Sequence, residues 1–193
     1  MLRRVARGGT LSSVGVCKQV VAPVGPYTGG FTARISKVTP EGIVTTVADK
    51  LPSDQTSAAQ GSLVSGVADV AFVGNKLYAI LAGAGCSHGL AGTHNGVLRV
   101  KPDGSTTMVA NLSAFQKRHP VANPQPDDFE PDGTWYSMIA VHGDLYAIEP
   151  NHGDSMPSRR KEKSAGSWIS QTYRVTSSPP RWPSTAMISS SGT

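Results

Sequence analysis

The chain has 193 residues with 21 glycines and 14 prolines, and only 16% of its residues are charged. This composition is typical of many short strands joined by turns and excludes a mainly helical protein. The net charge is +5, but most of the excess lies in residues 154–193, where six cations stand against two anions. The rest of the chain is close to neutral, so no nucleic-acid partner is expected.

The sequence leads us to expect neither a membrane span nor a signal peptide. No apolar run reaches the ~18 residues that a spanning helix needs, so no membrane span is expected. The opening MLRRVARGGT is basic with no apolar run behind it, which does not fit a signal peptide. The two cysteines, Cys17 and Cys86, are too few for a disulfide framework and lack metal-ligand spacing. A single bridge between them stays open.

Four hairpins are predicted in chain order, each from two β-rich runs around a turn. The first joins 31–38 to 43–49 through Pro40-Glu41-Gly42, and the second joins 67–73 to 76–82 through Gly74-Asn75. The third joins 96–101 to 105–110 through Pro102-Asp103-Gly104, and the fourth joins 135–141 to 144–149 through His142-Gly143-Asp144.

The hairpins are of two alternating kinds that repeat. ISKVTPEGIVTTVAD (35–49) aligns without a gap with VLRVKPDGSTTMVAN (97–111), and VGNKLYAI (73–80) aligns with VHGDLYAI (141–148). Self-similarity at about 60–70 residues, built from short strands, indicates a propeller or an array. We therefore predict an all-β protein, an incomplete β-propeller fragment of about two four-stranded blades.

Three regions follow from this pattern. Residues 1–30 are interpreted as the remnant of a preceding blade and its loop, and 31–153 as the partial propeller repeats. Residues 154–193 are rich in Ser, Pro and Arg and break the rhythm, so we expect a disordered basic tail, translated out of frame. The outermost hairpins would present unpaired edges through which copies of the chain could self-associate.

The sequence segments within the repeats resemble those of the ScyD/ScyE family of β-propeller proteins, which are named from the scytonemin gene cluster. The resemblance covers about residues 5–153 and is carried by GVADVAFVGNKLYAILAGAGCSHG (66–89), NGVLRVKPDGS (95–105), ANLSAFQKRHPVANPQPDDFEPDGTWYSM (110–138) and LYAIEPNHG (145–153). It implies a propeller, frequent export and no established reaction. Family members are longer and have more blades, so the resemblance also implies that this chain is a truncated fragment.

In a propeller, the loops that join strands 2 to 3 and 4 to 1 emerge on one face. The loop 82–89, the long loop 111–134 and the loop that begins at Glu149 are therefore expected together. Candidate ligand-contacting residues on this face are Cys86, His88, Asp127, Asp128, Glu130, Glu149, Asn151 and His152.

Two kinds of metal site are open on this face. His88 and His152 follow equivalent LYAI strands, and with Glu149 they could bind a divalent metal such as Zn²⁺. Alternatively, these histidines hydrogen-bond loop backbone. The acidic run 127–133 could bind Ca²⁺, or it is a solvated turn. A Cys86–His88 nucleophile is a third, weaker alternative.

The sequence is therefore compatible with three functions. The chain is a binding or scaffold module that holds a small molecule or a protein on its loop-rich face, or a lyase or hydrolase with a histidine-bound metal, or a non-functional remnant. The cellular compartment stays open.

Overall fold

The computed structural model describes residues 1–120, 130–149 and, for the backbone, 171–176. These residues form three antiparallel sheets, so the all-β prediction is confirmed. The first sheet contains β1 (Leu2–Val5), β2 (Thr28–Val38), β3 (Val44–Gln55) and β4 (Val64–Ser65) in that order. The second contains β5 (Val67–Val73), β6 (Lys76–Leu81), β7 (Gly96–Val100) and β8 (Thr106–Asn111). The third has the order β11 (Gln171–Thr176), β10 (Asp144–Glu149), β9 (Ser137–Val141).

All four predicted hairpins are present, as β2–β3, β5–β6, β7–β8 and β9–β10. The two Pro-acid-Gly turns have the same geometry, because Gly42 and Gly104 both adopt positive φ, at 84° and 82°. Only glycine takes that conformation without a steric cost. The second sheet, 67–111, is the uninterrupted four-stranded meander that the sequence predicts as one whole unit.

The sequence predicts about two four-stranded blades, whereas the structure has three sheets, two with four strands and one with three. β1 lies within the segment interpreted as a remnant, and it pairs with β2. At the other end, β11 lies within the predicted disordered tail and pairs with β10. The prediction of disorder is therefore wrong for Gln171–Thr176, where six residues pair in register with β10; the remainder of that tail lies outside the described residues.

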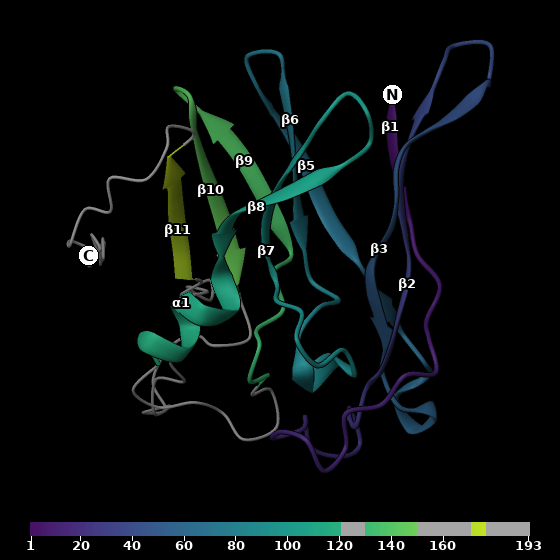
Figure 1. The fold of residues 1–193 in the computed structure, drawn as a ribbon, viewed down its shortest axis with the longest axis vertical. Coiled ribbons are helices and arrows are strands. Elements are labelled where there is room, and N and C mark those ends of the chain that lie inside the picture. The colour runs from purple at the N-terminus through teal and green to yellow at the C-terminus, as the bar shows by residue number, and fades with distance from the viewer. Residues whose placement is uncertain (121–129, 150–170, 177–193) are drawn as a thin grey trace, which may run out of the picture.

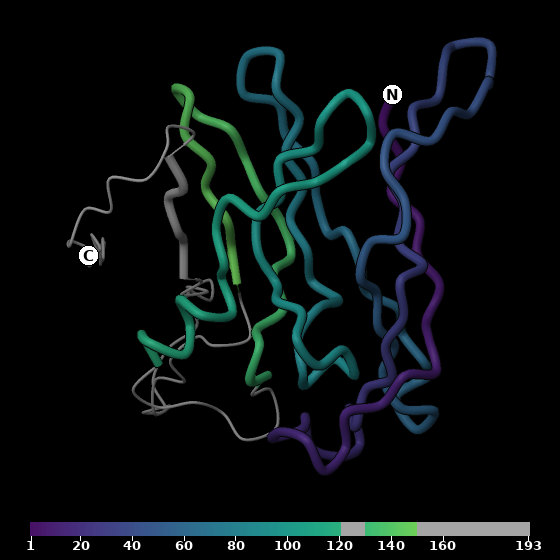
Figure 2. Tube along the Cα trace, in the orientation of Figure 1, coloured from purple at the N-terminus to yellow at the C-terminus, as the bar shows by residue number. Residues whose placement is uncertain are grey.

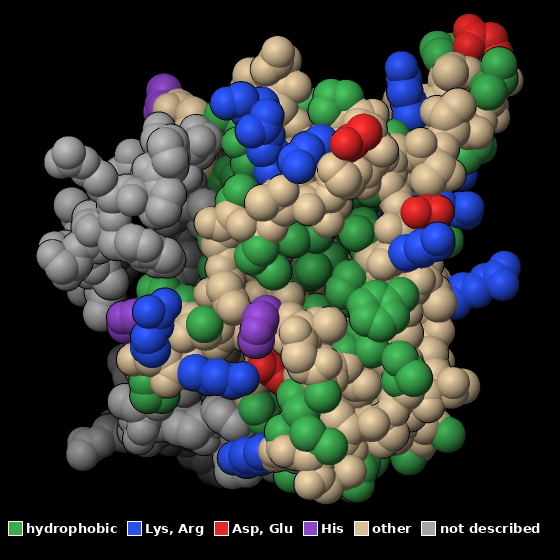
Figure 3. Space-filling view, viewed as in Figure 1, with side chains coloured by type: hydrophobic (Ala, Val, Ile, Leu, Met, Phe, Trp, Pro, Cys, Tyr) green, Lys and Arg blue, Asp and Glu red, His purple; other side chains and the backbone are tan. Residues whose placement is uncertain are grey.

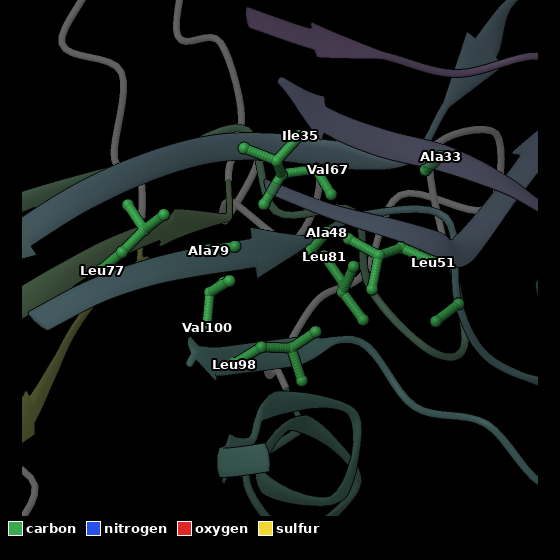
Figure 4. Close-up of a cluster of buried hydrophobic side chains, with 11 residues drawn as sticks. Ala33, Ile35, Ala48, Leu51, Val67, Leu77, Ala79, Leu81, Leu98 and Val100 are labelled. Atoms are coloured by element: carbon green, nitrogen blue, oxygen red, sulfur yellow. The ribbon is translucent and has the colours of Figure 1, made fainter. Parts of the chain in front are cut away.

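Both faces of strand β6 are covered from residue 77 to residue 81, and this is why these five residues are apolar; only Lys76, at the exposed start of the strand, is charged. Leu77, Ala79 and Leu81 point into a cluster shared with the first sheet, drawn in Figure 4. Tyr78 and Ile80 point into a second cluster shared with the third sheet. Successive side chains of a strand alternate between faces, so a strand covered on both sides has no polar positions.

The three sheets stand in a row, with the third, second and first running from left to right in Figure 1. The tight hairpin turns lie at one end of the row. The segment that joins β1 to β2, the loop after β6 and the loop after β8 lie at the opposite end, as the trace in Figure 2 shows. We call this opposite end the loop-rich end. It also carries η2 (Cys86–His88), α1 (Leu112–Arg118) and η1 (Ala58–Gln60), which connects β3 to β4.

On the face seen in Figure 3, hydrophobic side chains gather in the middle and lysine and arginine side chains lie around them. Lys117 and Arg118 lie in the last turn of α1, where a positive charge is favourable against the helix dipole. No helix among the described residues is long and apolar enough to cross a membrane.

Candidate functional site

His88 is the centre of a buried polar cluster at the loop-rich end. It lies in the single turn η2 and its side chain is fully buried. The Nδ1 atom bonds the Oδ2 atom of Asp54, near the end of β3. The Nε2 atom lies 3.2 Å from the carbonyl oxygen of Gly133 and 3.9 Å from the Oε2 atom of Glu130. His88 therefore joins the first sheet, the second sheet and the segment that leads into the third.

Burial by itself would lower the pKa of His88, but the carboxylate of Asp54, helped by Glu130 and Asp132, raises this pKa to about 9. The imidazole is therefore positively charged at neutral pH. Both of its nitrogens then carry protons and donate, one to a carboxylate and one to a backbone carbonyl.

In this arrangement both ring nitrogens of His88 already face protein oxygens, the Asp54 carboxylate at Nδ1 and the carbonyl oxygen of Gly133 at Nε2. The other members of the predicted metal set are placed differently. Glu149 is buried and accepts a hydrogen bond from the backbone N–H of Thr134, at 3.1 Å. His152 and Asn151 lie outside the described residues. Within residues 1–120 and 130–149, no group of three or more His, Cys, Asp or Glu side chains is arranged to hold a metal ion.

Glu130 closes the cluster from the long loop before β9. The hydroxyl of Tyr27 donates to its Oε1 atom at 2.6 Å, and the Tyr27 ring lies 5.1 Å from the His88 ring. Burial raises the pKa of Glu130, although His88 and Tyr27 act in the opposite direction. Burial and the neighbouring Glu130 also raise the pKa of the Tyr27 hydroxyl, which therefore stays protonated and remains a donor.

Asp132 makes a second connection between η2 and the same loop. Its Oδ2 atom accepts from both the backbone N–H and the hydroxyl of Ser87, each at 2.8 Å. Its Oδ1 atom accepts from the Nζ atom of Lys117 on α1, also at 2.8 Å. Burial raises the pKa of Asp132, but the hydrogen bonds from these donors lower it by more, so the pKa lies below its ordinary value.

The acidic run of 127–133 is therefore not a solvated turn where it is described. Glu130 and Asp132 are 5% and 2% exposed and point into the protein. Their oxygens already meet a hydroxyl, a backbone N–H and an ammonium group, so these two side chains do not form an open calcium site. Asp127 and Asp128 lie outside the described residues.

Asn95 is a buried member of this cluster that the sequence analysis did not identify. Its Oδ1 atom accepts from the backbone N–H of Ala84 at 2.7 Å, and its Nδ2 atom donates to the carbonyl oxygen of Gly133 at 2.6 Å. Its own backbone N–H donates to the hydroxyl of Ser113, at the start of α1. A fully buried asparagine directly before β7 is the available sequence signal, but Asn before a strand is also a common turn residue.

Cys86 forms a disulfide with Cys17, which lies in the segment between β1 and β2. The bridge left open by the sequence is thus present, and the described chain has no free cysteine. While this bridge is intact Cys86 cannot be the nucleophile of the weaker Cys86–His88 alternative, because a disulfide sulfur has no thiolate to attack with.

A cavity of about 270 Å³ lies where strands of the three sheets approach one another. Arg4 and Val5 of β1, Val67 of β5 and Tyr136, directly before β9, contribute to its wall. The guanidinium of Arg4 pairs with Asp69 at 3.3 Å and is 41% exposed. The lining therefore combines apolar surface with one arginine whose guanidinium is oriented by a carboxylate partner.

Comparison with protein-family models, with curated proteins and with solved structures found no match for this chain.

Proposed function

We propose that the chain is a β-propeller binding or scaffold module of the ScyD/ScyE kind, and that its ligand occupies the cavity beside Arg4 at the junction of the three sheets. The repeated hairpins and the strand order of the second sheet support the propeller. In this proposal β1, β5 and β9 are strands near the propeller axis, and each sheet is a blade.

The observation that carries the proposal is the wall of the cavity, which brings together residues of β1, β4 and β5 with Tyr136. The loops of the loop-rich end are also fixed. His88 and Asp132 connect loops from different sheets through buried contacts, and the partly buried Cys17–Cys86 disulfide adds a covalent link. Such loops are held before any ligand arrives, so binding costs little ordering entropy. A rigid site with one oriented cation suits recognition of a small molecule or of a protein side chain.

The competing proposal, a lyase or hydrolase with a metal held by His88, His152 and Glu149, requires a neutral His88 with a free nitrogen. The ion pair of His88 with Asp54 and its contact with Gly133 argue against it. The binding module therefore accounts better for the same residues.

The test uses benzoate as the probe, because it combines an aromatic ring with a carboxylate. Chemical shifts of the cavity residues are followed by NMR as benzoate is added. We expect saturable shifts at Val67 and Ala68 that are lost in Arg4→Gln. The matched control is Arg3→Gln, because Arg3 is the neighbouring exposed cation on β1 and does not line the cavity. Equal, non-saturating shifts in all three proteins would contradict the proposal.

A further inference from the structure

The segment between β1 and β2 contains an arm, residues 12–22, which is fixed at both ends. Before the arm, Leu11 exchanges two backbone hydrogen bonds with Gly29, at 3.0 and 2.8 Å. After it, the carbonyl oxygen of Val24 accepts from the backbone N–H of Ser57 at 2.9 Å. The arm therefore starts and ends at positions that are tied to the first sheet and its connection.

Between these ends, two contacts of the arm with the body of the protein converge on Cys86. Cys17 is joined to it by the disulfide, and the hydroxyl of Ser13 donates to its carbonyl oxygen. Gln19 bonds within the arm, to the carbonyl oxygens of Ser13 and Cys17 at 3.1 and 3.0 Å. Val20 is buried.

Several apolar side chains of the arm face solvent instead of packing against the sheets, as expected for a segment that can detach. Val14, Val16 and Val21 are 59%, 68% and 49% exposed. Cys17 and Cys86 are both only partly buried, so a reductant can approach the bridge. Few buried apolar contacts are a property of segments that open locally at low free-energy cost.

The other side of the disulfide is anchored independently of it. Directly after Cys86, Ser87 bonds Asp132 and His88 bonds Asp54, and both pairs are buried. Cleavage of the disulfide therefore removes a constraint from the arm while η2 stays attached to its partners.

We propose that the Cys17–Cys86 disulfide is a redox-controlled clasp, and that its reduction releases residues 12–22 from the loop-rich end. The reductant is a dithiol. One of its thiolates attacks a sulfur of the bridge, giving a mixed disulfide and a free thiolate on the other cysteine. Its second thiol then displaces the remaining cysteine, so the dithiol is oxidised to a disulfide and the protein gains two thiols. Release of the arm exposes the buried side chain of Val20 and the thiol of Cys17.

Hydrogen–deuterium exchange with mass spectrometry tests this inference on the full chain, with and without dithiothreitol. The chain has only two cysteines, so the reductant has no other disulfide within it to cleave. We expect exchange in 12–22 to rise at least about tenfold on reduction, with β5–β8 and 84–90 unchanged. Unchanged exchange in 12–22 would overturn the inference, and so would a rise spread over all three sheets.

The double variant Cys17→Ser/Cys86→Ser provides the second measurement. It should exchange in 12–22 as the reduced protein does, and dithiothreitol should have no effect on it. A residual effect of the reductant on the variant would contradict the assignment. Because neither measurement uses a ligand, a failure of the benzoate experiment leaves this inference standing, and the reverse also holds.

Discussion

Replacing Asp54 by Asn tests how His88 contributes to stability. Asp54 and His88 are buried and paired, and the substitution leaves a buried imidazole without its opposite charge. Removing one partner of a buried ion pair typically costs about 3–5 kcal/mol of unfolding free energy. The raised pKa gives a similar figure, because a shift from 6.5 to about 9 corresponds to roughly 3 kcal/mol of linkage.

The pH dependence of this term has a definite sign. The folded protein holds the His88 proton more tightly than the unfolded chain does, so the stabilisation is fully present below about pH 6.5. It is lost as the pH rises through the folded pKa of about 9. We therefore expect the unfolding free energy of the wild type to fall by about 3 kcal/mol between these values.

Urea unfolding, followed by circular dichroism at several pH values, measures both effects. Asp54→Asn should have a lower unfolding free energy than the wild type at neutral pH. Its unfolding free energy should also change little between pH 6.5 and 9, whereas that of the wild type falls. The matched control is Asp49→Asn, because Asp49 is an exposed aspartate on the same strand. A decline of equal size in the wild type and in Asp54→Asn would refute the reasoning, whatever the difference at neutral pH.

Three further predictions use other contacts of the loop-rich end. The double variant Cys17→Ser/Cys86→Ser should lose about 4 kcal/mol in urea unfolding, because the bridge spans a sequence separation of 69 residues and restricts the unfolded chain. Gly89→Ala should melt far below Gly92→Ala, although both glycines have φ of 81°, because only the Gly89 Cβ would meet backbone, at 2.5 Å; equal melting temperatures would contradict this. Asp132→Ala should lower the unfolding free energy by about 2–4 kcal/mol near pH 7 and by less at acid pH. The reason is that the pKa of Asp132 lies below its ordinary value, so the stabilisation from its charge disappears as the pH falls below 3.8. An equal difference between the two proteins at every pH of an acid titration would show that this charge does not contribute.

The strands could be predicted because their signals are local. The Pro-acid-Gly turns around Gly42 and Gly104 and the β-branched runs beside them fix two hairpins within some fifteen residues each. The apolar run of β6 also indicates a strand that is buried on both faces. These features need no knowledge of the rest of the chain.

The helix α1 was missed although its signals are also local. Asn111 caps it by accepting from the backbone N–H of Ala114, and Leu112 and Phe115 follow at helical spacing. The surrounding segment was interpreted as loop because only seven residues are helical. A helix this short is stabilised mainly by packing, as the burial of Leu112 against the second cluster shows.

The polar cluster could not be predicted beyond the position of His88. Asp54 lies 34 residues before its partner, in a stretch that has no motif, and Tyr27 is 103 residues from Glu130. Such pairs depend on which sheets become neighbours. The sequence placed His88 and Glu130 at one end of the molecule and left open whether His88 binds a metal or hydrogen-bonds loop backbone. In the structure His88 lies between the Asp54 carboxylate and the backbone carbonyl of Gly133, which the sequence could not specify.

The protonation state of His88 is the most direct test of the central claim, that the protonated His88 side chain joins loops of different sheets through hydrogen bonds. The ring nitrogens are observed by ¹⁵N NMR at about pH 7.5, and the signals of His88 are assigned by their loss in His88→Gln. We predict that both nitrogens carry protons and that added Zn²⁺ leaves their shifts unchanged. An unprotonated ring nitrogen, or a stoichiometric shift with Zn²⁺, would contradict the account and favour the metal-dependent enzyme.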